Sequence, residues 1–225
     1  MKRLVVPSVM CLTLLQERGP VRSFRGPPQA CLSALAGYVD AIGFIELGGF
    51  FVSFMSGNST RLAVGLVDGS SEAVLAGGLI ATFVAGVVAG SLVGKLAKDR
   101  RRSAVLLLVA ALLALAAAAS MIGATAPAIV AMVLAMGAEN AVFERDDEVH
   151  IGLTYMTGTL VKLGQRFTVA ILGGARLGWL PYFLLWLGLV LGACIGALAH
   201  AHLGLNGLWI AAASAGLCSY AASRL

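Results

Sequence analysis

Long apolar runs separated by short polar segments dominate the chain from residue 30 onward. They occupy residues 31–54, 72–95, 103–123, 126–143, 179–200 and 206–222. A helix rises about 1.5 Å per residue, so most of these runs are long enough to cross the roughly 30 Å hydrocarbon core of a bilayer. The pattern predicts an all-α integral membrane protein with about six transmembrane helices.

The segment at residues 151–174 is long enough to span as well, but it carries a polar stripe. Lys162, Gln165 and Arg166 are spaced i, i+3 and i+4, which places them on one face of a helix. We expect an interfacial or re-entrant amphipathic helix here rather than a seventh span.

Composition supports a membrane protein. Of the 225 residues, 59% are hydrophobic and only 12% are charged, whereas soluble domains have about 25% charged residues. The net charge of +5 does not point to nucleic acid, because the basic residues are clustered between apolar runs. We therefore expect the lipid bilayer as the main partner.

The basic residues predict the orientation of the chain. With six spans and a cytoplasmic N-terminus, every Lys and Arg except Arg61 falls on the cytoplasmic side, and the run at 98–102 is the strongest anchor. Both termini are then cytoplasmic. Residues 1–29 are basic, with an apolar stretch too short to span, and we expect a poorly ordered N-terminal arm.

The chain contains an internal repeat. Met55–Leu62 resembles Met156–Leu163, and Gly37–Ala41 resembles Gly137–Ala141. A glycine stripe follows in each half, and the sequence aligns Gly86, Gly90 and Gly94 with Gly188, Gly192 and Gly196. We interpret residues 30–125 and 126–225 as two membrane repeats.

Each repeat contains three predicted spans, and an odd number forces the two halves into opposite orientations. Inverted-topology repeats of this kind recur in secondary transporters, with the binding site near the bilayer midplane. Glycines four residues apart let another helix backbone approach closely. We expect each stripe to pack against the other half; the alternative partner is another subunit in a homo-oligomer.

These motifs resemble a known family. G-x-x-D-A followed by S-G-N-S in the first half, and G-x-x-N-A with Y-x-T-G-T-L in the second, are similar to the YoaK-like family of bacterial inner-membrane proteins. The resemblance rests on Asp40, Gly57, Asn58, Asn140, Gly158 and Thr159. It implies a bacterial inner-membrane protein, mostly of six helices, without indicating a substrate. One departure is Glu139, where the family pattern has Gln.

Ionisable residues within the apolar runs are candidates for function, because burying them in lipid is expensive. Asp40 lies near the middle of the first run and Glu46 further along it. For Asp40, a proton-coupling role and a structural hydrogen bond are equally good interpretations; Glu46 fits a cavity or outer interface better than a substrate site. Glu139 is a third candidate, with an interfacial ion pair to Arg145 as its competing role.

The two glycine motifs are further candidates. Ser56, Gly57 and Asn58, like Thr157, Gly158 and Thr159, are poor helix formers, so we expect a helix break at each place, with Asn58 or Ser59 as an N-cap. Such breaks would aim free amides into a protein-lined space, and Arg61 and Lys162 follow each Gly by four residues. Two functional interpretations follow: the breaks bind an anionic group, or the two basic residues pair with Asp40, Glu46 or Glu139 as gates. The alternative is a tight turn at the membrane surface at each place.

The leading hypothesis is a secondary transporter for a small molecule or ion, with a site between the repeats. A non-transporting scaffold or complex subunit is the alternative, and an intramembrane enzyme ranks last because no nucleophile elbow, HExxH, phosphate-binding loop or CxxC occurs. We expect no enzymatic activity, cofactor or metal. Transport coupled to protons through Asp40 predicts loss of pH-driven flux in Asp40→Asn.

Overall fold

A computed structural model describes residues 29–145, 148–149 and 156–224, and within these residues the protein is helical apart from one hairpin of two-residue strands, β1 (Glu144–Arg145) and β2 (Glu148–Val149). The helices are α2 (Gln29–Glu46), α3 (Met55–Asp68), α4 (Ser71–Ala97), α5 (Arg101–Met121), α6 (Thr125–Glu139), α7 (Met156–Ile171), α8 (Leu180–Leu203) and α9 (Leu208–Ser223). Short 3-10 turns lie at Lys98–Arg100, Asn140–Phe143 and Gly204–Gly207. The all-α prediction is confirmed.

The predicted apolar runs correspond to α2, α4, α5, α6, α8 and α9, and the amphipathic segment at 151–174 to α7. The first run is the exception, because α2 ends at Glu46 rather than at residue 54. Gly48 and Gly49 follow with φ angles of 61° and 102°, a left-handed conformation that ends the helix. The predicted N-terminal arm lies outside the described residues.

Three continuous helical stretches are long and apolar enough to cross a membrane. They are Ser71–Met121, which joins α4 to α5, Thr125–Val142, and Leu180–Ser223, which joins α8 to α9. α2, which carries Asp40 and Glu46, is not among these stretches. The described helices are therefore those of a membrane protein.

Two close helix crossings organise the fold. α2 crosses α8, where a Cβ on Gly192 or Gly196 would overlap the carbonyl groups of Ala34 and Tyr38. α6 crosses α4, where a Cβ on Gly86 would overlap Leu134 and one on Gly90 would lie 2.7 Å from the carbonyl oxygen of Ala138. Backbones approach this closely only where glycine lacks a side chain. These two glycines of each stripe thus pack within the chain, against a helix from the other half of the sequence.

Equivalent positions of the two halves are in contact at both crossings. The equivalence of the glycine stripes in these contacts differs from their alignment in the sequence. A Cβ on Gly37 would meet Leu189 and Ala193, and a Cβ on Gly137 would meet Phe83 and Val87. These contacts are 106 positions apart along the chain (189 − 83 and 193 − 87). Gly86 therefore corresponds to Gly192, whereas the alignment pairs it with Gly188. The shift is one helical turn, because the α7–α8 connection is longer than the α3–α4 connection.

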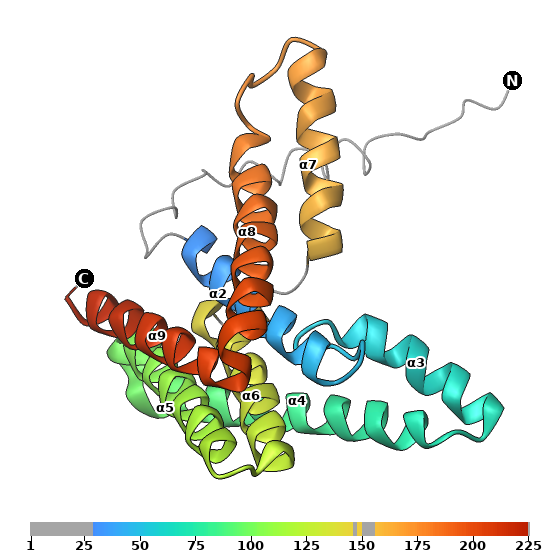
Figure 1. Ribbon diagram of the computed structural model, residues 1–225. Coiled ribbons are helices and arrows are strands. Elements are labelled where there is room, and N and C mark those ends of the chain that lie inside the picture. Colours follow the sequence, from blue (N-terminus) through green and yellow to red (C-terminus); the bar gives the residue numbers. More distant parts are fainter. Residues whose placement is uncertain (1–28, 146–147, 150–155, 225) are drawn as a thin grey trace, which may run out of the picture.

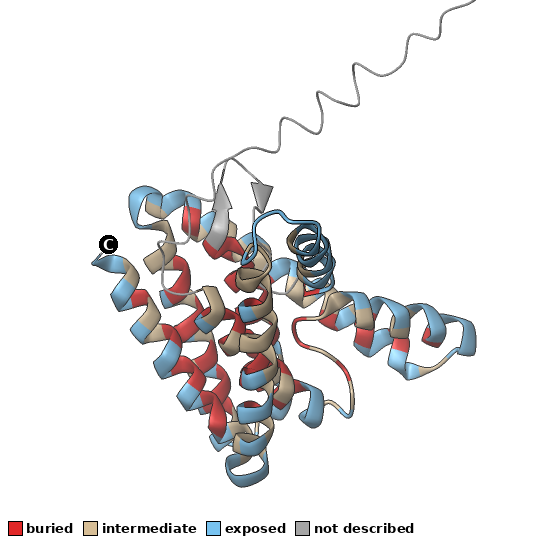
Figure 2. Cartoon of the chain, turned by 90° about the horizontal axis from the view of Figure 1, so that it is seen from above, coloured by how far each residue is buried: buried red, intermediate tan, exposed pale blue. Residues whose placement is uncertain are grey.

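Two helical arms extend from these crossings. α3 packs along α4 and α7 along α8, whereas α5 and α9 lie side by side (Figure 1). Buried positions gather along the central helices and become sparse along the arms (Figure 2). Hydrogen bonds tie the centre together: the Ser219 hydroxyl of α9 donates to the carbonyl of Ser103 on α5 at 2.8 Å, and Tyr38 donates to the carbonyl of Gly207 at 2.8 Å.

The close crossing predicts that Gly192→Ala destabilises the protein, because the added Cβ would overlap the Ala34 carbonyl. Overpacking costs about 1–3 kcal/mol, so we expect a lower melting temperature in detergent. Gly78→Ala in α4 is the matched control: no atom of a neighbouring segment lies within 4 Å of its Cβ, and Ala favours a helix by about 1 kcal/mol over Gly. Equal melting temperatures for both variants would contradict the crossing.

Candidate functional site

A non-helical segment lies inside the helix group between α2 and α3. Residues 47–54 leave the end of α2 and turn back into the protein, where Phe50, Val52 and Ser53 are 5%, 0% and 2% exposed. Non-helical backbone at membrane depth is tolerated only where its amide and carbonyl groups find partners. We call residues 47–54 the re-entrant segment because they fold back into the helix group, and their hydrogen-bond partners define the site.

Asp40 and Asn58 supply these partners from the two flanking helices. One oxygen of the Asp40 carboxylate accepts hydrogen bonds from the backbone amides of Val52 at 3.0 Å and Ser53 at 2.8 Å. The Asn58 side chain accepts from the amide of Phe51 at 3.0 Å and donates to the Phe51 carbonyl at 2.7 Å. Both side chains are buried. The structure thus gives Asp40 a structural role, holding the re-entrant segment.

The helix after the first predicted break starts earlier than expected: its N-cap is Phe54, four residues before Asn58. α3 begins at Met55 and has no side-chain cap, so Asn58 and Ser59 lie inside the helix and are not N-caps. The amides of Met55, Gly57 and Asn58 donate to the carbonyls of Ser53 and Phe54. Because the local backbone satisfies these donors, this helix start is not an open anion site.

Gly57 and Arg61 have structural neighbours. A Cβ on Gly57 would lie 2.8 Å from the Phe51 ring, so this position accommodates the re-entrant segment. The Arg61 guanidinium lies over the Phe50 ring at 4.5 Å and 3.8 Å from the Glu72 carboxylate. The expected pairing of Arg61 with Asp40, Glu46 or Glu139 is not formed. Ser56, also predicted, is exposed.

The second motif lies in different surroundings. α7 begins at Met156, the counterpart of Met55, but Thr157, Gly158 and Lys162 are exposed and no atom of a neighbouring segment lies within 4 Å of a Cβ at Gly158. Thr159 is half-buried and has a partner. Gly57 faces an aromatic ring and Gly158 faces open space, so the two glycines do not line one cavity among the described residues. The residues preceding α7 lie outside the described ones.

Glu139 occupies the most unusual position among the predicted residues. It ends α6 with a fully buried side chain, and neither of its carboxylate oxygens has a hydrogen-bond partner within the described part of the chain. Arg101 of α5 donates to the carbonyl of Ala141 at 3.2 Å. The side chain of Arg145, the predicted ion-pair partner of Glu139, is not among those described.

The neighbouring Asn140 is buried and bonded. Its side-chain amide donates to the Met136 carbonyl at 3.0 Å, and it has a further partner. Asn140 occupies the position in the second half that Asp40 occupies in the first. Both residues therefore use their polar groups to hold backbone, whereas Glu139 does not.

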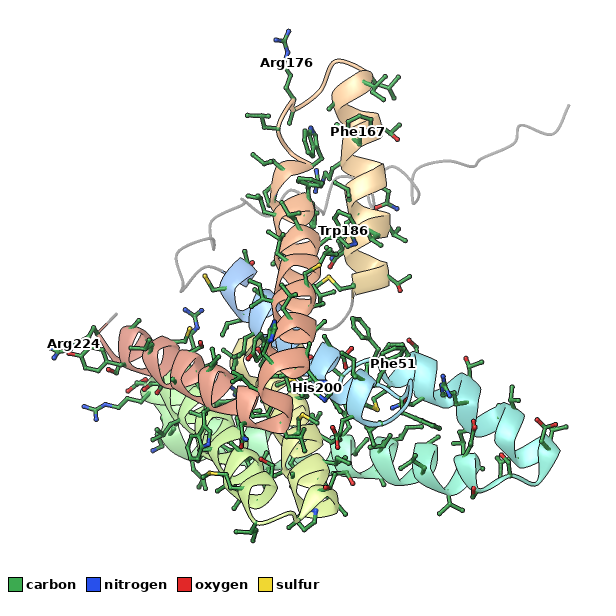
Figure 3. All side chains as sticks on the ribbon, viewed as in Figure 1. Phe51, Phe167, Arg176, Trp186, His200 and Arg224 are labelled. Carbon is green, nitrogen blue, oxygen red and sulfur yellow. The ribbon has the colours of Figure 1, made fainter. Side chains whose placement is uncertain are left out.

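Sequence reasoning missed some partners. Glu46 binds His200 of α8, which Figure 3 labels, with the imidazole Nε2 3.1 Å from the carboxylate. Glu72 pairs with Arg61. Both pairs join two helices. The members of the first pair are distant along the chain and those of the second lie in successive helices, so spacing within one helix gave no signal for either pair. No group of three metal-ligating side chains occurs among the residues searched, which are the described ones.

The buried re-entrant segment and the apolar helices define a helical integral membrane protein. The chain belongs to the family described as "Protein of unknown function (DUF1275)", whose model matches residues 29–221. It is similar to the UPF0700 transmembrane protein RA0705 of Rhizobium meliloti (strain 1021), with 39% identity over 196 residues, covering 87% of this chain and 85% of the relative. No solved structure matches. An uncharacterised membrane family agrees with the resemblance above; the YoaK-like assignment itself stays a prediction.

The clamp on the re-entrant segment predicts a difference between two substitutions of Asp40. Asp40→Ala leaves the amides of Val52 and Ser53 without their acceptor, and an unsatisfied buried donor costs about 1–3 kcal/mol. We expect faster hydrogen exchange in peptides covering residues 50–54. Asp40→Asn keeps an acceptor oxygen and should exchange close to the wild-type rate. Equal exchange in Asp40→Ala and the wild type would contradict the clamp.

Proposed function

We propose that the protein is a small secondary transporter built from two inverted repeats, residues 30–125 and 126–225, in which Glu139 binds the coupling proton or cation. The transported species is a small molecule or ion. We place the protein in the bacterial cytoplasmic membrane as a multi-pass protein with both termini in the cytoplasm, as the distribution of basic residues predicts.

The matched crossings support the repeat. α2 of the first half crosses α8 of the second, and α6 of the second half crosses α4 of the first, with equivalent residues in contact at both places. α3 and α7 both begin at the matched methionines and pack on α4 and α8 respectively. Exchange of equivalent helices between two halves is the arrangement expected of a duplicated transporter.

Glu139 is the observation that carries the proposal. An ionised carboxylate buried without hydrogen bonds or a counter-ion costs several kcal/mol. Since its oxygens have no such partner among the described residues, the group is either protonated or awaits a cation. Buried ionisable residues in membrane helices commonly mark proton or ion pathways. Glu139 lies on a helix of the second half packed against α4 and α5 of the first, which supports a position between the repeats.

Asp40 has a different task in this proposal. Its carboxylate oxygen holds two backbone amides of the re-entrant segment, so it positions that segment and does not carry the proton. Of the two roles that the sequence leaves open for Asp40, the proposal takes the structural one. The distinction is testable, because both carboxyls can be replaced by amides of nearly the same shape.

The buried position of Glu139 implies an occluded state. Its side chain has no exposed surface, so exchange with either side of the membrane requires α6 to move against its neighbours. Small-residue contacts suit such movement, because the α4–α6 crossing is formed by glycine and backbone groups rather than by interlocked large side chains. Rocking of one repeat against the other is the corresponding transport motion.

Reconstituted protein tests the proposal by comparing two amide variants. Glu139→Gln should abolish labelling by dicyclohexylcarbodiimide, which reacts with protonated buried carboxyls, and reduce pH-gradient-driven uptake of a panel of small solutes and ions to the rate of protein-free liposomes. Asp40→Asn is the matched control and should retain both. Labelled peptides are located by mass spectrometry, and uptake is followed with isotopes and an internal pH dye.

Two outcomes would overturn the assignment. Coupled uptake that is undiminished in Glu139→Gln would exclude Glu139 as the coupling group, and loss of coupling only in Asp40→Asn would return that role to Asp40. If neither the wild type nor the variants take up any solute, and the protein purifies with a stoichiometric protein partner, the scaffold alternative is favoured. The melting temperature of each variant shows whether the fold is retained.

A further inference from the structure

A shallow apolar groove lies between α7 and the start of α8. Leu160, Leu163, Gly164 and Phe167 line one side, and Trp179 and Phe183 line the other, around a volume of about 340 Å³. The Phe167 and Trp179 rings meet edge to face with centroids 5.9 Å apart, and Trp179 meets Phe183 at the same distance. Phe167 lies on the side of α7 that faces α8 (Figure 3). All six lining residues are apolar, which suits a hydrocarbon chain.

Two cationic residues border this groove. Arg166 lies on α7 and Arg176 lies in the α7–α8 connection, where its carbonyl accepts a hydrogen bond from the Trp179 indole at 2.9 Å, and both side chains are exposed. The aliphatic stem of Arg166 lies 3.9 Å from the Cβ position of Gly178, next to Trp179. Figure 3 shows Arg176 extending outward from the far end of the α7–α8 arm. The groove therefore has an apolar floor and a basic rim.

The basic rim has no acidic neighbour on its own elements. The sequence contains no Asp or Glu after Glu148, so α7, α8 and the connection between them carry only positive formal charge. The cations at 98–102 differ, because Asp99 lies among them. The rim thus needs anions from outside this part of the chain.

We infer that this groove is a binding site for an anionic phospholipid, with one acyl chain against the aromatic side chains and the phosphate group at Arg166 and Arg176. Basic clusters beside apolar clefts in membrane proteins bind acidic headgroups, and each Lys or Arg near such a surface is worth about a fivefold change in binding. Tryptophan is the residue type that membrane interfaces favour. A free phosphate would use the rim without the groove, and a second protein copy would use the groove without the excess charge.

Quenching of Trp179 fluorescence by brominated lipids tests the site directly. Trp186→Phe and Trp209→Phe leave Trp179 as the single tryptophan of the full chain. In nanodiscs that contain a small fraction of lipid with brominated acyl chains, we expect phosphatidylglycerol to quench at least about fivefold more effectively per molecule than phosphatidylcholine, the effect of a single cation. Equal quenching by the two lipids would overturn the proposal.

Three variants separate the rim from the groove. Arg166→Gln/Arg176→Gln should bring the ratio of the two lipids to about one, whereas Arg100→Gln/Arg224→Gln removes the same charge from exposed positions elsewhere and should keep the preference. Gly164→Leu fills the groove and should reduce quenching by both lipids; its Cβ meets no neighbouring segment. A preference that survives the first double substitution would contradict the site.

The same samples distinguish other occupants. Millimolar inorganic phosphate should leave the lipid preference unchanged; its loss would assign the rim to free phosphate and overturn the lipid site. If neither brominated lipid quenches Trp179 and the protein sediments as a dimer, the groove is occupied by a second copy of the chain and the lipid site is wrong. Neither test uses transport, so the lipid site stands or fails independently of the function proposed for Glu139.

Discussion

Close backbone contact at two glycine crossings is the constraint on which the rest of this fold depends. α2 and α6, which carry Asp40 and Glu139, are held against α8 and α4 where glycine allows carbonyl groups of one helix to meet the backbone of the other. Helices in lipid gain little from burying apolar side chains against one another, so close packing of this kind becomes a principal source of association. The crossings thereby fix the depth of both carboxyls and leave room for a chain segment beside α2.

The two carboxyls show how a membrane protein uses buried charge in opposite ways. Asp40 accepts two amides and so allows an extended segment to enter the helix group, which would otherwise expose polar backbone to an apolar environment. Glu139, equally buried, satisfies no described backbone group. A group without a structural task is the better candidate for one that changes its state during a cycle.

Helix positions could be predicted from the sequence, because apolar run length is a local signal. α4, α5, α8 and α9 begin and end within a few residues of the predicted runs. The re-entrant turn at Gly48 was hidden, because an apolar segment that folds back is as hydrophobic as one that continues. The pairing of Glu46 with His200 and the one-turn shift of Gly86 onto Gly192 depend on helix crossings, which spacing along the chain does not encode.

The difference between the two arms gives the halves unequal mechanical roles. α3 joins α4 through a short turn, buries Asn58 and Gly65 and carries the Arg61–Glu72 pair, whereas α7 has a longer connection to α8 and buries only Met156 among its described side chains. Segments with few buried contacts detach at a lower free energy than the rest of a fold. The two halves of the chain therefore share a packing plan but differ in local stability: the α7 arm detaches from the helix group at a lower free energy than the α3 arm.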